Sequence, residues 1–109
     1  MTLDINVARG LMLGDGFRKL LVGVTGPSTY TTGGDPLAAG QVRMGVIEYI
    51  PPFICTDGTN AVWGHYNIAT GKIQFFWITG APAGGAVAPE VGNGTALNTM
   101  VGRMLVYGR

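Results

Sequence analysis

The sequence predicts an all-β domain, and three observations lead to that prediction. Nineteen glycines and six prolines are spread along the 109 residues, with short apolar runs between them. No window of about a dozen residues holds an apolar stripe at helical spacing that is free of Gly or Pro. Strand-like runs separated by turn-forming residues recur instead. We therefore expect a single compact β-sandwich or jelly-roll-like barrel over residues 1–109, with long loops rich in Gly and Pro.

The predicted elements are taken from the N-terminus onward. Residues 1–13 are expected to form an N-terminal arm or an edge strand, because Gly10 and the β-branched residues before it weaken a helix. Further on, Asp57–Asn60 is turn-forming and Pro51–Pro52 cannot donate to a sheet ladder. Five apolar runs are predicted as strands: Phe17–Thr25, Val42–Ile50, Ala61–Ala69, Lys72–Thr79 and Leu97–Tyr107. The last run is apolar on both faces, which is typical of a central strand.

The best-defined local unit is a hairpin over Ala61–Thr79 with its turn at Ala69–Lys72. Thr70 is poorly suited to the positive φ of a two-residue turn, so the loop can be longer than two residues. Gly64 is expected to leave room for the Trp77 indole. The expected cross-strand pairs are Ile68 with Ile73, Tyr66 with Phe75, Gly64 with Trp77 and Val62 with Thr79.

The other face of this hairpin starts polar and becomes apolar, with His65 expected opposite Phe76 and Trp63 opposite Ile78. A hairpin that is apolar on both faces at one end is expected to be packed on both sides there. One face is therefore assigned to the core and the other to a contact with another subunit. The uncharged segment Gly80–Pro89 is also expected to lie against a neighbour, because an exposed loop of that length usually carries more polar side chains.

Charged residues are scarce in this chain. They make up 12% of the sequence, seven basic and six acidic, against about 25% in typical proteins. Such a composition argues against a solitary, freely soluble monomer, and we expect other subunits to cover much of its surface. The net charge of +1 supplies no electrostatic footprint for nucleic acid or an anionic membrane. No apolar stretch approaches the roughly 20 residues needed to cross a bilayer.

The residues that carry catalysis are also scarce. Ser28 is the only serine and His65 the only histidine, and no nucleophile motif surrounds the serine. Cys55 is the only cysteine, so a disulfide or a zinc site within one chain is not expected, and we interpret it as a small buried hydrophobe. The first residues lack the basic and apolar regions of a signal peptide, which favours assembly in a cytosol. We predict no enzyme, no cofactor and no metal.

A series of short motifs resembles small structural proteins that are encoded among the head genes of tailed bacteriophages. The series begins with a Tyr-x-Thr-Gly-Gly-x-Pro-Leu pattern within Ser28–Leu37 and continues through the strand-like Met44–Ile50. The Thr70–Ile73 turn follows, then Glu90–Leu97, and last a closing strand that ends in Gly108–Arg109. Each motif is short, and their order is the stronger part of the resemblance.

This resemblance implies a capsid decoration, or cement, protein. Such proteins bind the outside of the assembled shell and reinforce junctions between major capsid subunits, commonly as trimers of a β-sandwich or jelly-roll-like unit. We therefore expect a virion protein of the capsid exterior, made in the bacterial host cytoplasm. Its expected partners are the major capsid protein and its own copies. Neither nucleic acid nor a membrane is an expected partner. The candidate subunit or capsid interface consists of Trp63, His65, Phe76, Ile78, Tyr30, Pro82 and Val87.

Other functions remain open from the sequence. A sugar-binding β-sandwich, or a neck or tail appendage of the virion, would share this composition. Exposure of Trp63 or Tyr30 beside Asn, Asp or His would favour sugar binding. Burial of Trp63, Phe76 and Ile78 between subunits would favour a cement protein. An enzyme would require a concave site that unites Ser28, His65 and a carboxylate.

Overall fold

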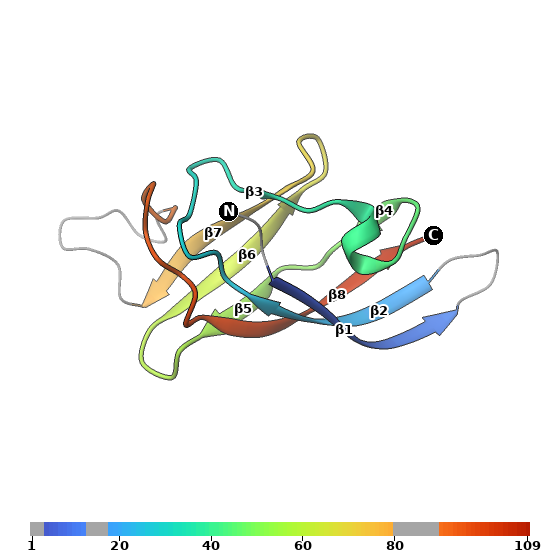
Figure 1. Ribbon diagram of the computed structural model, residues 1–109, viewed down its shortest axis with the longest axis horizontal. Helices are drawn as coiled ribbons and strands as arrows, with labels where there is room; N and C mark the ends of the chain where they lie inside the picture. Colours follow the sequence, from blue (N-terminus) through green and yellow to red (C-terminus); the bar gives the residue numbers. More distant parts are fainter. Residues whose placement is uncertain (1–3, 13–17, 80–89) are drawn as a thin grey trace.

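The computed structural model describes residues 4–12, 18–79 and 90–109. The prediction of an all-β fold is confirmed, since the elements in these ranges are strands apart from one short 3₁₀ helix (Figure 1). The strands are β1 (Asp4–Met12), β2 (Arg18–Thr25), β3 (Asp35–Pro36), β4 (Ile47–Tyr49), β5 (Phe53–Thr56), β6 (Ala61–Asn67), β7 (Lys72–Thr79) and β8 (Val101–Gly108). The 3₁₀ helix, η2, spans Ala39–Val42.

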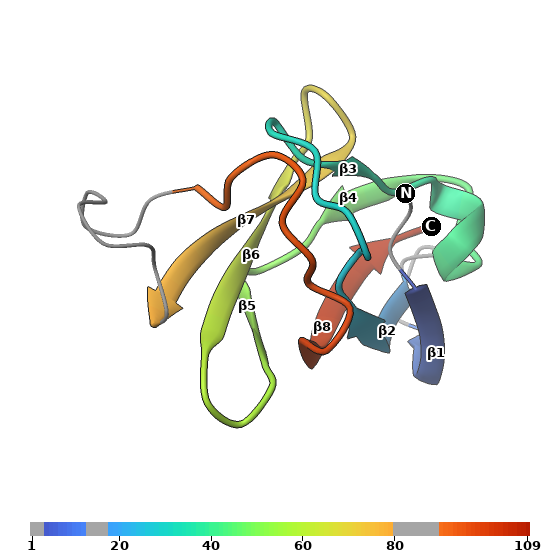
Figure 2. The same cartoon turned by 60° about the vertical axis from the view of Figure 1, so that its left-hand side comes forward.

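These strands form one antiparallel sheet in the order β1-β2-β8-β5-β6-β7-β3, and β4 pairs with β8 beside this path. The sheet curls into a half-barrel, and the chain between β2 and β4 lies on its concave side (Figure 2). β8 lies between β2 and β5, so the central position predicted for the last apolar run is confirmed. β1 is an edge strand, at the opposite end of this order from β3, and it pairs with β2.

The core fills the space between the concave face and the loops that cross it. Alternate side chains of the strands point inward, as the period of a β-strand requires. The buried apolar residues of β2 and β5–β8 are Leu20, Val22, Val24, Phe53, Cys55, Val62, Ile73, Phe75, Trp77, Met104 and Val106. The other connections, η2 and β4 contribute Tyr30, Leu37, Val42, Met44, Ile47, Ile50, Val91, Leu97 and Met100.

Three predicted strands are longer than the observed ones, and one of them, Ala61–Ala69, ends at Asn67 in β6. Val42–Ile50 is wrong in its first half, because Val42 ends η2 and only Ile47–Tyr49 pairs with β8. The cause is Arg43, whose φ of 58° lies in the left-handed region and interrupts an extended chain. The last strand begins at Val101 instead of Leu97, since residues 97–100 form a turn closed by a backbone hydrogen bond of 3.0 Å.

β5 was not among the predicted strands. It is only four residues long and follows Pro51–Pro52, so its alternation is too short to stand out in the sequence. In the structure it joins the two halves of the sheet, pairing with β6 along its whole length and with the start of β8. Its inward residues are Phe53 and Cys55, and its outward residues are Ile54 and Thr56.

The hairpin of β6 and β7 exists, but its predicted register is wrong by two residues. Tyr66 lies opposite Ile73 instead of Phe75, and Val62 lies opposite Trp77. The turn is four residues long, because the Gly71 N–H donates to the Asn67 carbonyl over 2.8 Å. The faces predicted for the strand residues still hold, since a shift of two residues keeps every strand side chain on its own face. Ile68 was expected in the sheet and lies exposed in the turn.

Gly64 accommodates a different ring from the one expected. Its register partner is Phe75, and a Cβ atom at this position would overlap the ring of Phe53. The Trp77 indole therefore does not lie over it. Phe53 itself packs edge-to-face on Phe75, with 6.1 Å between ring centroids. The missing side chain of Gly64 lets the neighbouring strand place an aromatic ring at the centre of the core.

Candidate interaction surface

The outer face of β5, β6 and β7 carries a row of apolar side chains. Ile54, Trp63 and Phe76 are neighbours across the three strands, because Ile54 pairs with Trp63 and Trp63 pairs with Phe76. The rings of Trp63 and Phe76 are stacked, with 4.7 Å between centroids and 21° between planes. His65 lies next along β6, and its ring packs edge-on against Trp63 at 6.3 Å.

Two aliphatic side chains, Ile78 and Val101, extend this row, and they and Ile54 leave about half their surface exposed. Ile54 is 59% exposed, Ile78 is 48% exposed and Val101 is 53% exposed. Val101 joins the row because it pairs with Thr56, two residues along β5 from Ile54. We refer to the five outward residues as the apolar patch: Ile54, Trp63, Phe76, Ile78 and Val101.

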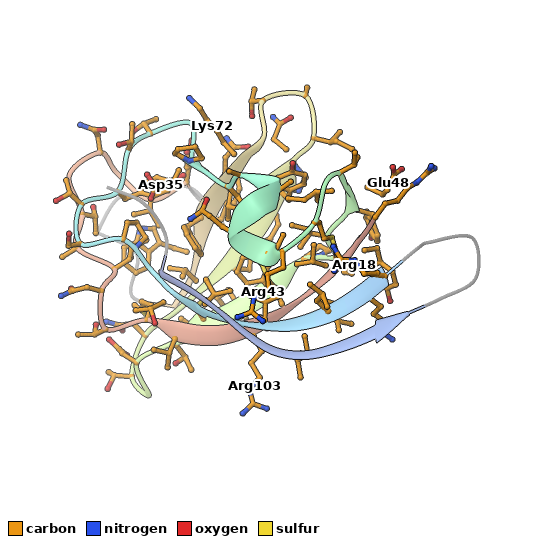
Figure 3. The ribbon with its side chains drawn as sticks, turned by 45° about the vertical axis from the view of Figure 1, so that its right-hand side comes forward. Arg18, Asp35, Arg43, Glu48, Lys72 and Arg103 are labelled. Carbon is orange, nitrogen blue, oxygen red and sulfur yellow. The ribbon has the colours of Figure 1, made fainter. Side chains whose placement is uncertain are left out.

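Polar side chains surround the apolar patch. His65 and Gln74 are cross-strand partners at one side, and Thr56 lies at the β5 end. Arg103 is two residues along β8 from Val101 and therefore projects from the same face of the sheet. Figure 3 shows this arginine pointing away from the molecule. The patch therefore has an apolar centre without ionisable groups and a polar rim, the anatomy of many protein–protein contacts.

A second exposed area lies at the opposite end of β8. Tyr49 is 57% exposed and its ring lies 6.2 Å from that of Tyr107, while Val46 is 51% exposed. Lys19 places its ammonium 5.7 Å from the Tyr107 ring centroid, a cation–π distance.

Charged side chains gather around these rings. The Arg18 guanidinium donates a hydrogen bond to the Arg43 carbonyl, and Arg109 Nε lies 3.7 Å from Glu48 Oε1. Figure 3 shows Arg18, Arg43 and Glu48 on the same side of the molecule. We call this area the basic end and define it by Arg18, Lys19, Arg43, Val46, Glu48, Tyr49, Tyr107 and Arg109. Among the described residues, four cations and one carboxylate belong to it.

The structure separates the residues that the sequence grouped into one interface. Trp63, His65, Phe76 and Ile78 share the outer face of the hairpin. Tyr30 is fully buried, so its assignment to the interface is wrong. Pro82 and Val87, with the segment Gly80–Pro89, lie outside the described residues. Sequence reasoning missed Ile54 and Val101, because β5 was not recognised and Val101 pairs with Thr56 of that strand.

Tyr30 is buried because its hydroxyl has two partners inside the molecule. It donates to Glu90 Oε2 over 2.6 Å and accepts a hydrogen bond from the Phe75 backbone N–H over 3.1 Å. Glu90 also accepts the Gly33 N–H over 2.7 Å. Burial, followed by the hydrogen bond to Glu90, raises the pKa of Tyr30. The group therefore serves to hold two loops against β7.

The remaining reactive side chains do not form one site. Ser28 is exposed in the loop after β2, and His65 is exposed on the outer face of β6. Burial raises the pKa of the Cys55 thiol to about 12, so the thiol stays protonated at neutral pH. Within residues 4–12, 18–79 and 90–109, no group of three His, Cys, Asp or Glu side chains could hold a metal ion.

Asp35 is a buried carboxylate at the start of β3. It is 1% exposed, and burial raises its pKa, an effect that the charge of Lys72 partly opposes. Figure 3 shows Lys72 above Asp35. The backbone of Asp35 pairs with Ile73. Gly34, the residue before Asp35, has a φ of 111°, and a Cβ atom there would lie 2.8 Å from the Ile73 carbonyl oxygen. This carboxylate is part of the packing of β3 on β7.

Comparison with known proteins adds no relative. No family model matches the chain, and no curated protein and no solved structure matches it with significance. In the part of the chain that the structure describes, no helix has the length and apolar character to span a membrane. The surface itself is therefore the observation on which a function can be argued.

Proposed function

We propose that this chain is a decoration, or cement, protein that binds the outside of an assembled bacteriophage head and stabilises contacts between major capsid subunits. The observation that carries the proposal is the presence of two separate areas with exposed apolar or aromatic side chains, the apolar patch and the basic end. A decoration subunit needs contacts of two kinds, with its own copies and with the shell. The resemblance of the motif series to phage head proteins supports the same function.

The two areas differ in their chemistry, which suits two different partners. The apolar patch has no ionisable residue, whereas exposed Tyr49 lies among the charges of the basic end. An apolar centre supplies binding free energy through burial, at about 25 cal/mol per Å² of apolar surface. Charges around exposed aromatics set orientation and association rate. No catalytic residue is required for this role.

Reinforcement of a shell follows from differential affinity. A protein that binds the expanded shell more tightly than an earlier or disassembled state shifts the equilibrium toward the expanded shell. Many copies act together, because each bound neighbour raises the effective concentration of the next contact.

Co-sedimentation tests the proposal. The purified chain is mixed with expanded capsids of the encoding phage from which this protein has been removed. We expect saturable binding at a copy number that matches the capsid symmetry, with a raised melting temperature of the shell. A folded sample that neither sediments with the capsids nor raises their melting temperature would contradict the proposal. Bovine serum albumin at the same concentration controls for trapping in the pellet.

One observation favours a second function, binding of a carbohydrate by a virion appendage. Trp63 is partly exposed and lies beside His65, an arrangement that can stack on a sugar and donate a hydrogen bond to it. Phe76 already covers one face of the Trp63 ring, which leaves less aromatic surface for a sugar. A glycan array with the intact chain tests this function, and a hit that Trp63→Ala abolishes would favour it over capsid binding.

A further inference from the structure

Asn93 and Gly94 form the tip of a turn in the segment before β8. Both residues are exposed, and the Thr95 N–H closes the turn on the Gly92 carbonyl over 3.2 Å. Gly94 has a φ of 86°, a positive value that glycine adopts without strain. The turn therefore presents an Asn-Gly pair to solvent.

An Asn-Gly pair contains both partners of a cyclisation. Once its proton is lost to a base, the backbone nitrogen of the glycine can attack the side-chain amide carbon of the asparagine, and no side chain on the glycine obstructs the approach. A bond from that nitrogen to Cγ forms, and the amide nitrogen takes a proton from water and leaves as ammonia. Water then opens the resulting succinimide ring at either carbonyl. The net reaction consumes water, releases ammonia and converts asparagine to aspartate or isoaspartate.

The fold holds both reacting groups of this pair in other hydrogen bonds. The Gly94 N–H, whose nitrogen is the nucleophile, donates to the Tyr30 carbonyl over 2.7 Å. The Asn93 Oδ1 accepts the Thr32 N–H over 3.2 Å, which holds the side-chain amide on the loop after β2. We call these two hydrogen bonds the clasp. A nitrogen that donates to a carbonyl keeps its proton, so the attack requires the clasp to open.

Opening of the clasp need not unfold the domain. The turn residues 92–94 are exposed, whereas Val91 and Leu97 anchor the segment on either side of the turn in the core. Local openings of exposed segments cost less free energy than global unfolding. The rate of reaction in the folded protein is then the rate in the open chain multiplied by the fraction of time that the clasp is open.

We propose that Asn93 is a site of spontaneous deamidation, that the clasp sets its rate, and that isoaspartate formation keeps the clasp from closing again. Isoaspartate routes the main chain through the side chain, which adds an extra carbon between residues 93 and 94 and displaces the Gly94 N–H from the Tyr30 carbonyl. Because ammonia is lost, the change runs in one direction and records the age of the folded protein. This inference goes beyond the proposed function and does not depend on it.

Ageing of the intact protein in mildly alkaline buffer tests the proposal, with Asn98 as a matched residue in the same chain. Asn98 is exposed and takes the same position in a turn, which the Met100 N–H closes on the Leu97 carbonyl, but Thr99 follows it in place of a glycine. Peptide mass mapping follows conversion at both asparagines. In guanidinium chloride, Asn93 should convert while Asn98 stays unchanged. In native buffer, conversion of Asn93 should be at least about tenfold slower than in guanidinium chloride.

Two tyrosine variants test the role of the clasp. Tyr30→Phe removes the hydroxyl bonds to Glu90 and Phe75, which hold the two sides of the clasp together and against β7, so native conversion of Asn93 should be at least about fivefold faster. Tyr49→Phe changes an exposed ring elsewhere and should age at the wild-type rate. Far-UV circular dichroism confirms the fold of each variant. If Tyr30→Phe does not fold, Glu90→Ala takes its place, since it removes the acceptor of the Tyr30 hydroxyl.

The aged product tests the effect on the clasp. The isoaspartate form, separated by ion exchange, should unfold at a lower urea concentration than freshly purified Asn93→Asp, which has the same charge and an unaltered main chain. Equal urea midpoints of these two proteins would overturn the proposal, as would a wild-type ageing rate in Tyr30→Phe. It is also overturned if Asn98 converts as fast as Asn93, or if native Asn93 converts as fast as in the denatured chain. The same holds if native Asn93 stays unmodified after about a hundred half-lives of the denatured reaction.

Discussion

The Tyr30 hydroxyl donates a hydrogen bond of 2.6 Å to the carboxylate of Glu90, a residue 60 positions further along the chain. The same hydroxyl accepts the backbone N–H of Phe75 on β7 over 3.1 Å. The Tyr30 N–H and C=O bond to the backbone of residues 95 and 94 over 2.8 and 2.7 Å. The buried residue Tyr30 thus joins the loop after β2 to the segment before β8 and to β7.

Replacement of Tyr30 by Phe removes the hydroxyl and its two hydrogen bonds while keeping the ring and the backbone bonds. The Phe75 N–H is then left buried without its partner, and Glu90 loses its shortest hydrogen bond. We expect the free energy of unfolding to fall by about 1–3 kcal/mol. Urea denaturation measures it, and Tyr49→Phe is the control, because Tyr49 is 57% exposed and its change should stay within about 0.5 kcal/mol. Equal effects at the two positions would contradict the assigned role of Tyr30.

Substitution of Gly64 tests the packing of the two central strands. A Cβ at this position overlaps the Phe53 ring, so Gly64→Ala forces the ring or the strand to move. We expect a loss of about 1–3 kcal/mol in unfolding free energy, the usual cost of overpacking a core. Gly40→Ala is the matched control, since nothing lies within 4 Å of a Cβ there. A melting temperature of Gly64→Ala equal to that of the wild type would contradict this packing.

The sequence predicts the strands of the hairpin well, because alternation and turn residues are local signals. β7 has the predicted bounds, Lys72–Thr79, for this reason. The register was missed because the turn begins one residue earlier than predicted, directly after Asn67, whose side-chain oxygen accepts the Ala69 N–H over 3.0 Å. An Asn at the end of an apolar run is a signal that could have found this turn.

The candidate surface was only partly predictable, because its membership depends on contacts between distant segments. Trp63, Phe76 and Ile78 were found from the hairpin alone. Ile54 was missed because four residues after two prolines give too little alternation, and only pairing with β6 places it beside Trp63. Tyr30 was misplaced because it stands in a polar loop, and the partners that bury it come from much later in the chain.

Two aspartates should change stability with pH in opposite directions. Burial raises the pKa of Asp35 above its ordinary value near 3.8, so the folded state favours the protonated form. The stabilising contribution of this group is complete below that ordinary value and is lost as the pH rises through the folded pKa. Asp35→Asn, which stays neutral, should therefore gain stability relative to the wild type as the pH rises from about 3 toward neutral.

Asp57 supplies the opposite case on the surface. Hydrogen bonds from the Asn60 and Thr59 backbone lower the pKa of Asp57. Its contribution is present above the ordinary pKa and is lost as the pH falls through the folded value. Asp57→Asn should thus be less stable than the wild type at neutral pH, with a difference that shrinks in acid. Urea midpoints at a series of pH values measure the stability of both variants relative to the wild type. If the two stability differences changed in the same direction with pH, the assignment would be contradicted.

Cys55 should be unreactive until the protein unfolds. Its side chain has no exposed surface in the native structure, and burial raises its pKa to about 12. Attack on a disulfide reagent requires an accessible thiolate, and the native fold supplies neither access nor charge. Labelling with Ellman's reagent at pH 8 should therefore be complete within seconds in urea and should follow the rate of opening in buffer. The Gly64→Ala variant supplies an internal check, because it weakens the packing of β6 beside Cys55 and should accelerate native-state labelling. Fast labelling of the wild type in buffer would show that the β5–β8 junction opens without global unfolding, and that Cys55 is not the inert core residue described above.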